Sequence, residues 1–245
     1  MFLKKLSNFF LELFFPKKCL NCGKNGIYLC QSCLNKIEIS QNNICPFCDR
    51  PVPNGLICEK CKERYFLDKL IWATPYSSVL IKELIKIFKY RYIKELAHPL
   101  SQLLIKSLTR RARLSLKHNA LVVAVPLHKQ RIRERDFNQA ELLAKEVAEY
   151  FSLPLNANVL IRKKYTPPQA KTKNHKARRK SLENTFEISP EFTKRCVAEN
   201  KNLLKEKTIV LVDDVFTSGA TLSEAAKVLK QAGAKKIWGL TVAKG

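Results

Sequence analysis

Four Cys-x-x-Cys pairs near the N-terminus restrict the possible folds of this chain more than any other feature of its sequence. They hold eight of the nine cysteines: Cys19/Cys22, Cys30/Cys33, Cys45/Cys48 and Cys58/Cys61. Two thiolates separated by two residues can grip one tetrahedral metal ion, and two such pairs complete a four-thiolate shell. The segment around them has too few apolar side chains for a hydrophobic core of its own. We therefore expect two structural Zn²⁺ ions to supply its folding free energy.

Two other uses of these cysteines fit the sequence less well. Disulfides would require export, and no small-residue cleavage site precedes Pro16. A redox pair normally occurs singly, beside a βαβ unit. The spacing does not decide which pairs share an ion, so the sequential pairing and an interleaved pairing both stay open. Cys196 stands alone and is expected to be a small buried or loop residue.

The charge of the chain favours polyanionic partners. Lys and Arg number 45 against 21 Asp and Glu, a formal charge of +24 over 245 residues. Such a surplus attracts nucleic acid, anionic lipid or phosphorylated metabolites. The apolar stretch over residues 2–15 is too short to cross a bilayer, so we expect no transmembrane segment and a cytoplasmic protein. Its spacing predicts an amphipathic helix over 1–16 that docks on the core, with a partner groove or a membrane surface as alternatives.

Beyond residue 64 the pattern alternates between strand and helix. Apolar, β-branched runs predict strands over 70–76, 120–125, 159–162, 208–212 and 237–242. Amphipathic spacing predicts helices over 79–89, 98–117, 141–151 and 221–231, the last with a capping box of Thr221 and Glu224 and a stop at Gly233. This alternation predicts an α/β fold, with a parallel sheet and helices on both faces. The expected division is a helix over 1–16, a double zinc-ribbon module over 17–64 and an α/β domain over 65–245.

The most informative segment for function is Ile209–Thr221, where a strand leads through two carboxylates into a loop of small residues and a helix. Loops at the carboxyl ends of parallel strands bind ligands in such sheets. Backbone N–H groups and hydroxyls there form a phosphate cradle, with Thr217, Ser218, Gly219, Ala220 and Thr221 as its members. Asp213 and Asp214 can accept hydrogen bonds from ribose hydroxyls and help hold Mg²⁺. Ala220 replaces the Lys of a nucleoside-triphosphate loop, so a sugar phosphate is expected; a simple helix cap is the alternative.

Basic residues after two other elements suit the same ligand. Arg131, Arg133 and Arg135 follow the strand that ends at Val125, and guanidinium groups bind phosphate oxygens in bidentate fashion. Lys89 and Arg91 lie at the end of a predicted helix. They could contact the same anion, but a solvated helix end without a binding role explains them equally well. Residues 162–180 include many Lys and Arg residues and no Asp or Glu. This composition suits a flap that closes over the ligand or a groove that binds nucleic acid.

These residues resemble the phosphoribosyl pyrophosphate (PRPP) motif of type I phosphoribosyltransferases, and the whole chain resembles the ComF family of competence-associated proteins. The resemblance is carried by the Cys pairs, Lys89–Arg91, Val125–Gln139, Pro167–Ala170 with Arg178 and Arg179, and the segment around Asp213. It implies a type I phosphoribosyltransferase-like parallel sheet preceded by a small zinc-ribbon module. It implies PRPP with Mg²⁺ as ligand and Asp213 and Asp214 as catalytic residues. The implied PRPP-binding set is Asp213, Asp214, Val215, Thr217, Ser218, Gly219, Ala220, Thr221, Lys89, Arg91, Pro126, Leu127, His128, Lys129, Arg131 and Arg133, with Pro126 to Arg131 as the pyrophosphate loop.

Three functions are compatible with these features. The first is an enzyme that transfers phosphoribose from PRPP to an unknown acceptor; purine-specific relatives usually carry an acidic base where this chain has Thr217, which argues against a purine. The second is a nucleic-acid-binding adaptor: the family implies a role in natural transformation, with imported single-stranded DNA and the DNA-uptake machinery as partners. Tyr90, Tyr92 and Tyr165 are candidate stacking platforms. The third is a PRPP-sensing regulator without turnover.

Overall fold

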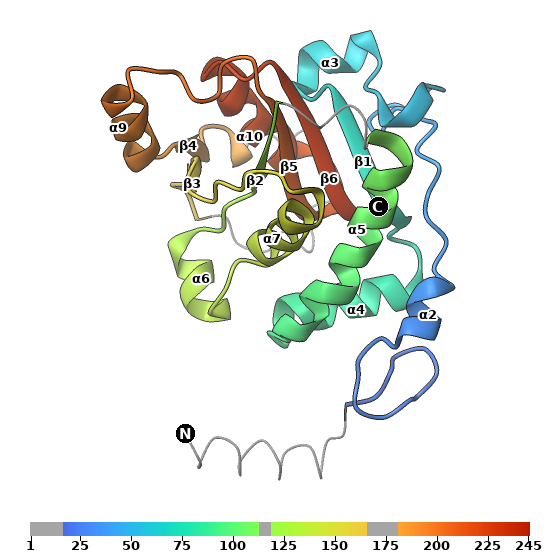
Figure 1. Cartoon of the computed structure of the whole chain (residues 1–245). Coiled ribbons are helices and arrows are strands. Elements are labelled where there is room, and N and C mark those ends of the chain that lie inside the picture. The colour runs from blue at the N-terminus through green and yellow to red at the C-terminus, as the bar shows by residue number, and fades with distance from the viewer. Residues whose placement is uncertain (1–16, 113–118, 166–180) are drawn as a thin grey trace, which may run out of the picture.

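A parallel sheet forms the centre of the protein. The computed structural model describes residues 17–112, 119–165 and 181–245 (Figure 1). Its main sheet has the order β1-β6-β5-β2, and every neighbouring pair is parallel. The strands are β1 (Lys69–Pro75), β2 (Ala120–Ala124), β5 (Thr208–Phe216) and β6 (Lys236–Lys244). The predicted parallel sheet is therefore confirmed.

The strands are apolar because both faces of the sheet are covered. Val122 pairs with Val210, which pairs with Trp238, and the two valines are fully buried. Beside β2, Leu155 adds a single parallel bridge to Val122, so the chain extends the sheet by one short segment on that edge.

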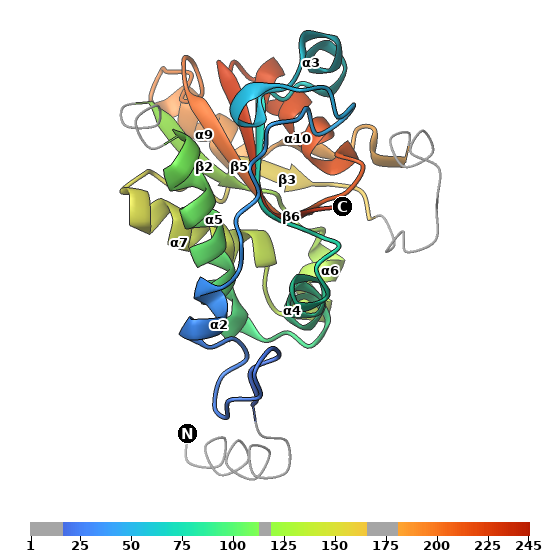
Figure 2. The ribbon, with the colours of Figure 1, turned by 90° about the vertical axis from the view of Figure 1, so that its right-hand side faces the viewer.

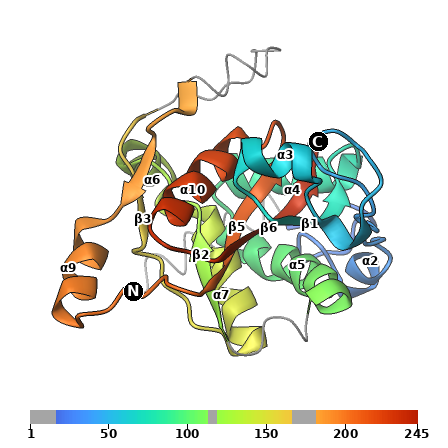
Figure 3. The same ribbon diagram turned by 90° about the horizontal axis from the view of Figure 1, so that it is seen from above.

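Helices cover both faces of this sheet, as the sequence predicts. Figure 3 shows α5 (Ala97–Ala112) and α7 (Gln139–Phe151) on one side of the strands. On the other side lie α10 (Ala220–Gln231) and α3 (Glu59–Tyr65). The remaining elements are α2 (Gln31–Asn35), α4 (Val79–Tyr90), α6 (Lys129–Arg135), α9 (Pro190–Ala198), the 3₁₀ turns η1 (Pro53–Gly55) and η2 (Lys94–Leu96), and the antiparallel pair β3 (Leu160–Arg162) and β4 (Phe186–Ile188).

The cysteine-rich segment is spread along the sheet. In Figures 1 and 2, α2 and α3 lie at opposite ends of the molecule. Between them the chain runs beside the edge strand β1: the N–H of Ser40 donates to the carbonyl of Ala73 at 2.8 Å, and Asn42 accepts from the N–H of Trp72 at 2.8 Å. This segment covers backbone groups that an edge strand would otherwise expose. The division into 1–16, 17–64 and 65–245 remains a prediction.

The structure differs from the sequence-based expectations at several places. The strand predicted over 159–162 is β3, which belongs to a separate antiparallel pair and not to the parallel sheet. The strand predicted over 208–212 continues to Phe216, so both aspartates belong to β5. The capping box at α10 was wrong: Gly219 is the N-cap without a side-chain cap, and Glu224 accepts a 2.7 Å hydrogen bond from the N–H of Asn184. Helix α6 occupies part of the expected pyrophosphate loop.

Some expectations fall outside the described residues. These are the N-terminal helix over 1–16, the end of the helix predicted over 98–117, and the segment 166–180 with Pro167–Ala170, Arg178 and Arg179. In the part of the chain that the structure describes, no helix has the length and apolar character needed to cross a bilayer.

Candidate functional site

The eight paired cysteines form two four-thiol clusters. Cys19, Cys22, Cys30 and Cys33 make up the first, and Cys45, Cys48, Cys58 and Cys61 the second; within each cluster the sulfur atoms lie within 4.8 Å of one another. The structure therefore selects the sequential pairing over the interleaved one. Four converging thiols are the donor set of a structural zinc site, and the chemistry fits Zn²⁺.

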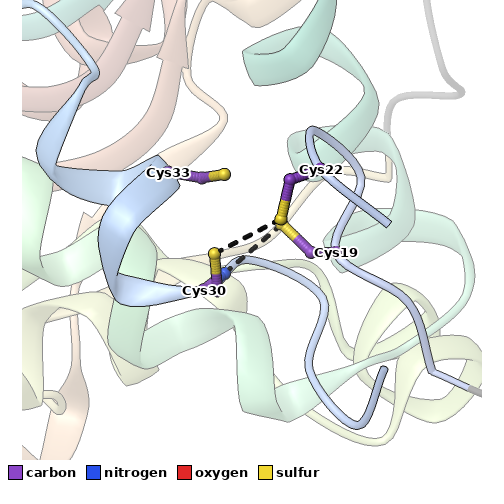
Figure 4. A group of neighbouring side chains, drawn as sticks. All are labelled: Cys19, Cys22, Cys30 and Cys33. Atoms are coloured by element: carbon purple, nitrogen blue, oxygen red, sulfur yellow. Dashed lines mark hydrogen bonds between the residues drawn. The ribbon is translucent and has the colours of Figure 1, made fainter. Parts of the chain in front are cut away.

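Backbone geometry explains how the first cluster closes. Figure 4 shows its four side chains converging from the knuckle at Cys19–Cys22 and from the start of α2. The N–H of Gly23 donates to the carbonyl of Cys19 at 2.9 Å, and Gly23 has a φ of +75° that glycine adopts without strain. Asn21 donates to the sulfur of Cys33 at 3.2 Å, a contact that stabilises a thiolate ligand.

A second candidate site is a cavity of about 460 Å³ at the carboxyl end of the sheet. It opens where β5 extends past β2: Ala124, the last residue of β2, pairs with Val212, and the residues of β5 beyond Val212 pair only with β6. Asp213, Asp214 and Val215 line the cavity there. The aspartates therefore face an open hollow, as the sugar-phosphate hypothesis requires.

The two carboxylates have different roles within the cavity. Asp214 is 8% exposed and forms a 2.6 Å ion pair with the ammonium group of Lys89, which comes from α4. Burial, the largest single influence, would lower the pKa of Lys89, but the charge of Asp214, its hydrogen bond to Lys89 and the charge of Asp213 together raise the pKa above its ordinary value. Lys89 is therefore a cation held in place by Asp214.

Asp213 is the carboxylate that remains for a ligand. Its Oδ1 accepts a 2.8 Å hydrogen bond from the N–H of Asp214. Burial, followed by the neighbouring charge of Asp214, raises the pKa of Asp213 to about 7, although Lys89 acts in the opposite direction. A carboxyl group with such a pKa changes its charge readily near neutral pH.

The loop that follows β5 has the form of a phosphate cradle. Thr217, Ser218 and Thr221 line the cavity. Gly219 is the N-cap of α10 with a φ of +73°, which brings the N-terminal end of the helix to the cavity. Phe47, between two ligands of the second cysteine cluster, packs against Gly219 and stacks on Tyr65 at 3.6 Å between ring centroids.

The segment after β2 contributes fewer residues than the resemblance implied. Leu127, His128 and Arg131 line the cavity, whereas Pro126, Lys129 and Arg133 do not. The reason is α6: its period of 3.6 residues places Arg131 and Arg135 on the cavity side and turns Arg133 to solvent. Arg91, which follows α4, is exposed and does not line the cavity. Gly219 and Ala220 do not line it either.

Sequence reasoning missed several lining residues, namely Tyr76, Asn138, Gln139, Arg162 and Leu182, and left Arg135 out of the binding set. The spacing of Arg131 and Arg135, four residues apart on α6, was the signal for the cationic face. Arg162 comes from β3; burial lowers its pKa although Asp213 acts to raise it. The sequence indicates a role for Arg162 only within the basic segment 162–180, whereas the structure places it in β3, which pairs with β4.

Comparison with known proteins agrees with this arrangement. A model of the double zinc ribbon domain matches residues 10–62, and a model of the phosphoribosyl transferase domain matches residues 138–244. The fold and the cysteine clusters thus define a phosphoribosyltransferase-like protein with a double zinc ribbon.

Three relatives resemble the chain over most of its length. The chain is 28% identical to Competence protein F of Haemophilus influenzae, over 87% of this chain and 96% of that protein. It is 27% identical to Competence protein ComFC of Bacillus subtilis, over 84% and 79%, and 26% identical to the DNA utilization protein YhgH of Escherichia coli K12, over 85% and 87%. The chain is therefore similar to proteins named for competence and for DNA utilization over most of its length.

Solved structures with a similar arrangement include two PRPP enzymes. One is the phosphoribosylpyrophosphate synthetase of Mycobacterium smegmatis, with a TM-score of 0.31 and 16% identity over 57% of this chain and 33% of that one. The other is the glutamine PRPP amidotransferase of B. subtilis, with a TM-score of 0.36 and 15% identity over 76% of this chain and 31% of that one.

Proposed function

We propose that this protein binds PRPP in the cavity at the carboxyl end of β5 and that it acts in DNA uptake. The observation that carries the PRPP assignment is that Asp213 and Asp214 line the same hollow as Thr217, Ser218 and Thr221. A phosphate at the start of α10 meets N–H donors and hydroxyls, and an adjacent ribose meets a carboxylate.

Different side chains of the cavity then contact different parts of PRPP during phosphoribosyl transfer. Asp213 accepts hydrogen bonds from the ribose hydroxyls, and Arg131 and His128 face the pyrophosphate end. In the reaction, the bond between the anomeric carbon and a pyrophosphate oxygen breaks and a bond to the acceptor forms with inversion. Cationic groups stabilise the charge of the leaving pyrophosphate. Mg²⁺, with Asp213 as an oxygen ligand, would neutralise further phosphate charge.

Calorimetry tests the binding part of this proposal. Wild-type protein is titrated with PRPP in the presence of Mg²⁺, and so is the double variant Asp213→Asn, Asp214→Asn. We expect the double variant to bind at least tenfold more weakly. The double variant Glu191→Gln, Glu199→Gln, which carries the same charge change at two exposed positions, one in α9 and one at its C-cap, should bind as the wild type does. Equal affinity in wild type and aspartate variant would refute the proposal.

Turnover needs a separate measurement, because a PRPP-sensing protein would bind equally well. Pyrophosphate release is followed with PRPP and single-stranded DNA oligonucleotides or free nucleobases as acceptors. Release above the rate of the aspartate variant identifies a transferase. If PRPP binds but none of these acceptors gives pyrophosphate release, the site belongs to a PRPP-sensing regulator.

The relatives' names support the cellular role, since two of them are competence proteins and the third is a DNA utilization protein. A strain that lacks the gene is expected to lose transformation by external DNA or growth on DNA. Complementation with the wild-type gene should restore the phenotype, and the aspartate variant should not. If the aspartate variant restored the phenotype fully, the cavity would not be needed for the cellular role.

A non-catalytic adaptor for single-stranded DNA is the second candidate function. Three exposed tyrosines favour it: Tyr90, Tyr92 and Tyr165 are 54%, 45% and 37% exposed. Exposed rings on a protein of charge +24 suit base stacking along a phosphate backbone. Replacing all three by Ala should weaken oligonucleotide binding, whereas replacement by Phe should preserve it. Salt-insensitive binding would count against this function.

A further inference from the structure

A buried arginine without an anionic partner lies in the wall of the cavity. Arg135, the last residue of α6, is 7% exposed, and its guanidinium lies over the ring of Tyr90 at 5.3 Å. Its guanidinium donates a hydrogen bond to a neutral acceptor, Oε1 of Gln139, at 3.1 Å. Among the described residues, no carboxylate lies within ion-pair distance of it. Because a buried cation is costly without a counter-charge, this site favours an anion from outside the chain.

Gln139 supplies a second unused donor at the same place. It is 1% exposed, lines the cavity, and its Nε2 has no hydrogen-bond partner in the described structure. The guanidinium of Arg135 fixes the orientation of this amide, since the flipped amide would set donor against donor. Nε2 is therefore left as a buried N–H donor, which costs free energy unless an acceptor enters the cavity.

The turn between α6 and α7 holds these two side chains ready. Asp136 ends α6 in a left-handed conformation and forms a 2.8 Å ion pair with Lys94. Asn138 is the N-cap of α7, and its Nδ2 donates to the carbonyl of Val125 at 3.1 Å. The turn is thus tied to the end of β2, and the positions of Arg135 and Gln139 are fixed before any ligand binds.

We propose that Arg135 and Gln139 form an oxyanion-binding subsite of the cavity, separate from the phosphate cradle at Thr217–Thr221. Its ligand is a phosphate or carboxylate group, which accepts from the guanidinium and from Nε2 together. Two sources share this chemistry: the pyrophosphate end of PRPP, and an acidic group on the acceptor. Which of these two sources supplies the anion depends on the proposed function. The existence of an anion-binding subsite does not depend on it.

Two variants test the subsite. Arg135→Met removes the charge at nearly constant length. Gln139→Glu is close to isosteric; it gives Arg135 a carboxylate partner and repels an incoming anion. Gln139→Glu should therefore raise the thermal midpoint of the ligand-free protein while it weakens anion binding, which separates a binding role from a merely structural one. Arg133→Met is the matched control, because Arg133 lies on the exposed side of the same helix.

The probes are pyrophosphate, PRPP, ribose 5-phosphate and inorganic phosphate, each measured by calorimetry. If the subsite takes the pyrophosphate end, both variants weaken pyrophosphate and PRPP binding at least tenfold and leave ribose 5-phosphate unchanged. If it takes an acidic group of the acceptor, both leave PRPP unchanged and abolish phosphate binding to the PRPP-saturated protein. Either result supports the subsite, and the Arg133→Met protein should behave as wild type.

The proposal is overturned if folded Gln139→Glu protein binds pyrophosphate, PRPP and inorganic phosphate as the wild type does. Failure of the proposed function looks different. In that case the wild-type protein does not bind PRPP or ribose 5-phosphate, yet both variants still lower its affinity for pyrophosphate or inorganic phosphate.

Discussion

Replacing Gly219 by Ala tests how the second zinc ribbon and the phosphate cradle fit together. Gly219 is the N-cap of α10, with a φ of +73°. A Cβ built at this position would lie 2.6 Å from Cε2 and 2.7 Å from Cζ of Phe216, and still closer to the ring of Phe47. Phe47 cannot retreat easily, because its other face is stacked on Tyr65 with an interplanar angle of 8°.

Two costs add up in this variant. A non-glycine residue in the left-handed region costs about 1–2 kcal/mol. Forcing a methyl group into packed rings costs a further ~1–3 kcal/mol. We therefore expect Gly219→Ala to lower the free energy of unfolding by about 2–5 kcal/mol. Gly26 is the matched control, since it has a φ of +84° and no atom within 4 Å of an added Cβ. Gly26→Ala should show only the backbone cost of ~1–2 kcal/mol.

Urea denaturation at saturating zinc measures both variants, and PRPP calorimetry follows on the folded proteins. Gly219→Ala should lose more stability than Gly26→Ala and should also bind PRPP more weakly, because the displaced rings move the cradle. Gly26→Ala should keep its PRPP affinity. If the two variants were equally stable, the argument from ring packing would be refuted.

Four further results are expected. Because the pKa of Asp213 is raised to about 7, PRPP affinity in the presence of Mg²⁺ should fall as the pH drops through 7 and the carboxylate takes up a proton; calorimetry on Asp213→Asn should show this pH dependence lost. The same shift makes the folded state bind this proton more tightly than the unfolded state, so the contribution of Asp213 to stability should decline as the pH rises from about 4 to 7. Lys89→Met leaves Asp214 buried without its counter-charge and should cost on the order of 2–4 kcal/mol in urea denaturation, with Lys86→Met, on an exposed position of the same helix, as the unaffected control. Asn42→Ala removes hydrogen bonds to both the N–H and the carbonyl of Trp72 and should cost about 2–4 kcal/mol, with faster hydrogen exchange at Trp72; unchanged exchange there would contradict the edge-covering role of this segment.

The local patterns predicted most of the core and much of the site. Each strand of the main sheet was visible as an apolar, β-branched run, because burial on both faces leaves little freedom for polar residues. The pairs of cysteines predicted two metal clusters, since ligand spacing is a local property. The segment around Asp213 was informative because strand, loop and helix start are adjacent in sequence, so the cradle is built without distant contacts.

Other features depend on contacts that no local pattern carries. The sequential pairing of the cysteine clusters became clear only from the folded chain, which extends along β1 between the two clusters. The resemblance implied a pyrophosphate loop from Pro126 to Arg131, but α6 begins at Lys129, turns Arg133 outward and brings Arg135 into the cavity. The capping box failed because Glu224 is engaged by the backbone of Asn184, far away in sequence.

The most direct test of the central claim is a crystal structure of the protein with PRPP and Mg²⁺. The account predicts the 5′-phosphate against the N–H groups of Thr217–Thr221, the ribose hydroxyls beside Asp213, and the pyrophosphate toward Arg131. PRPP bound at another surface, with this cavity unchanged, would contradict it.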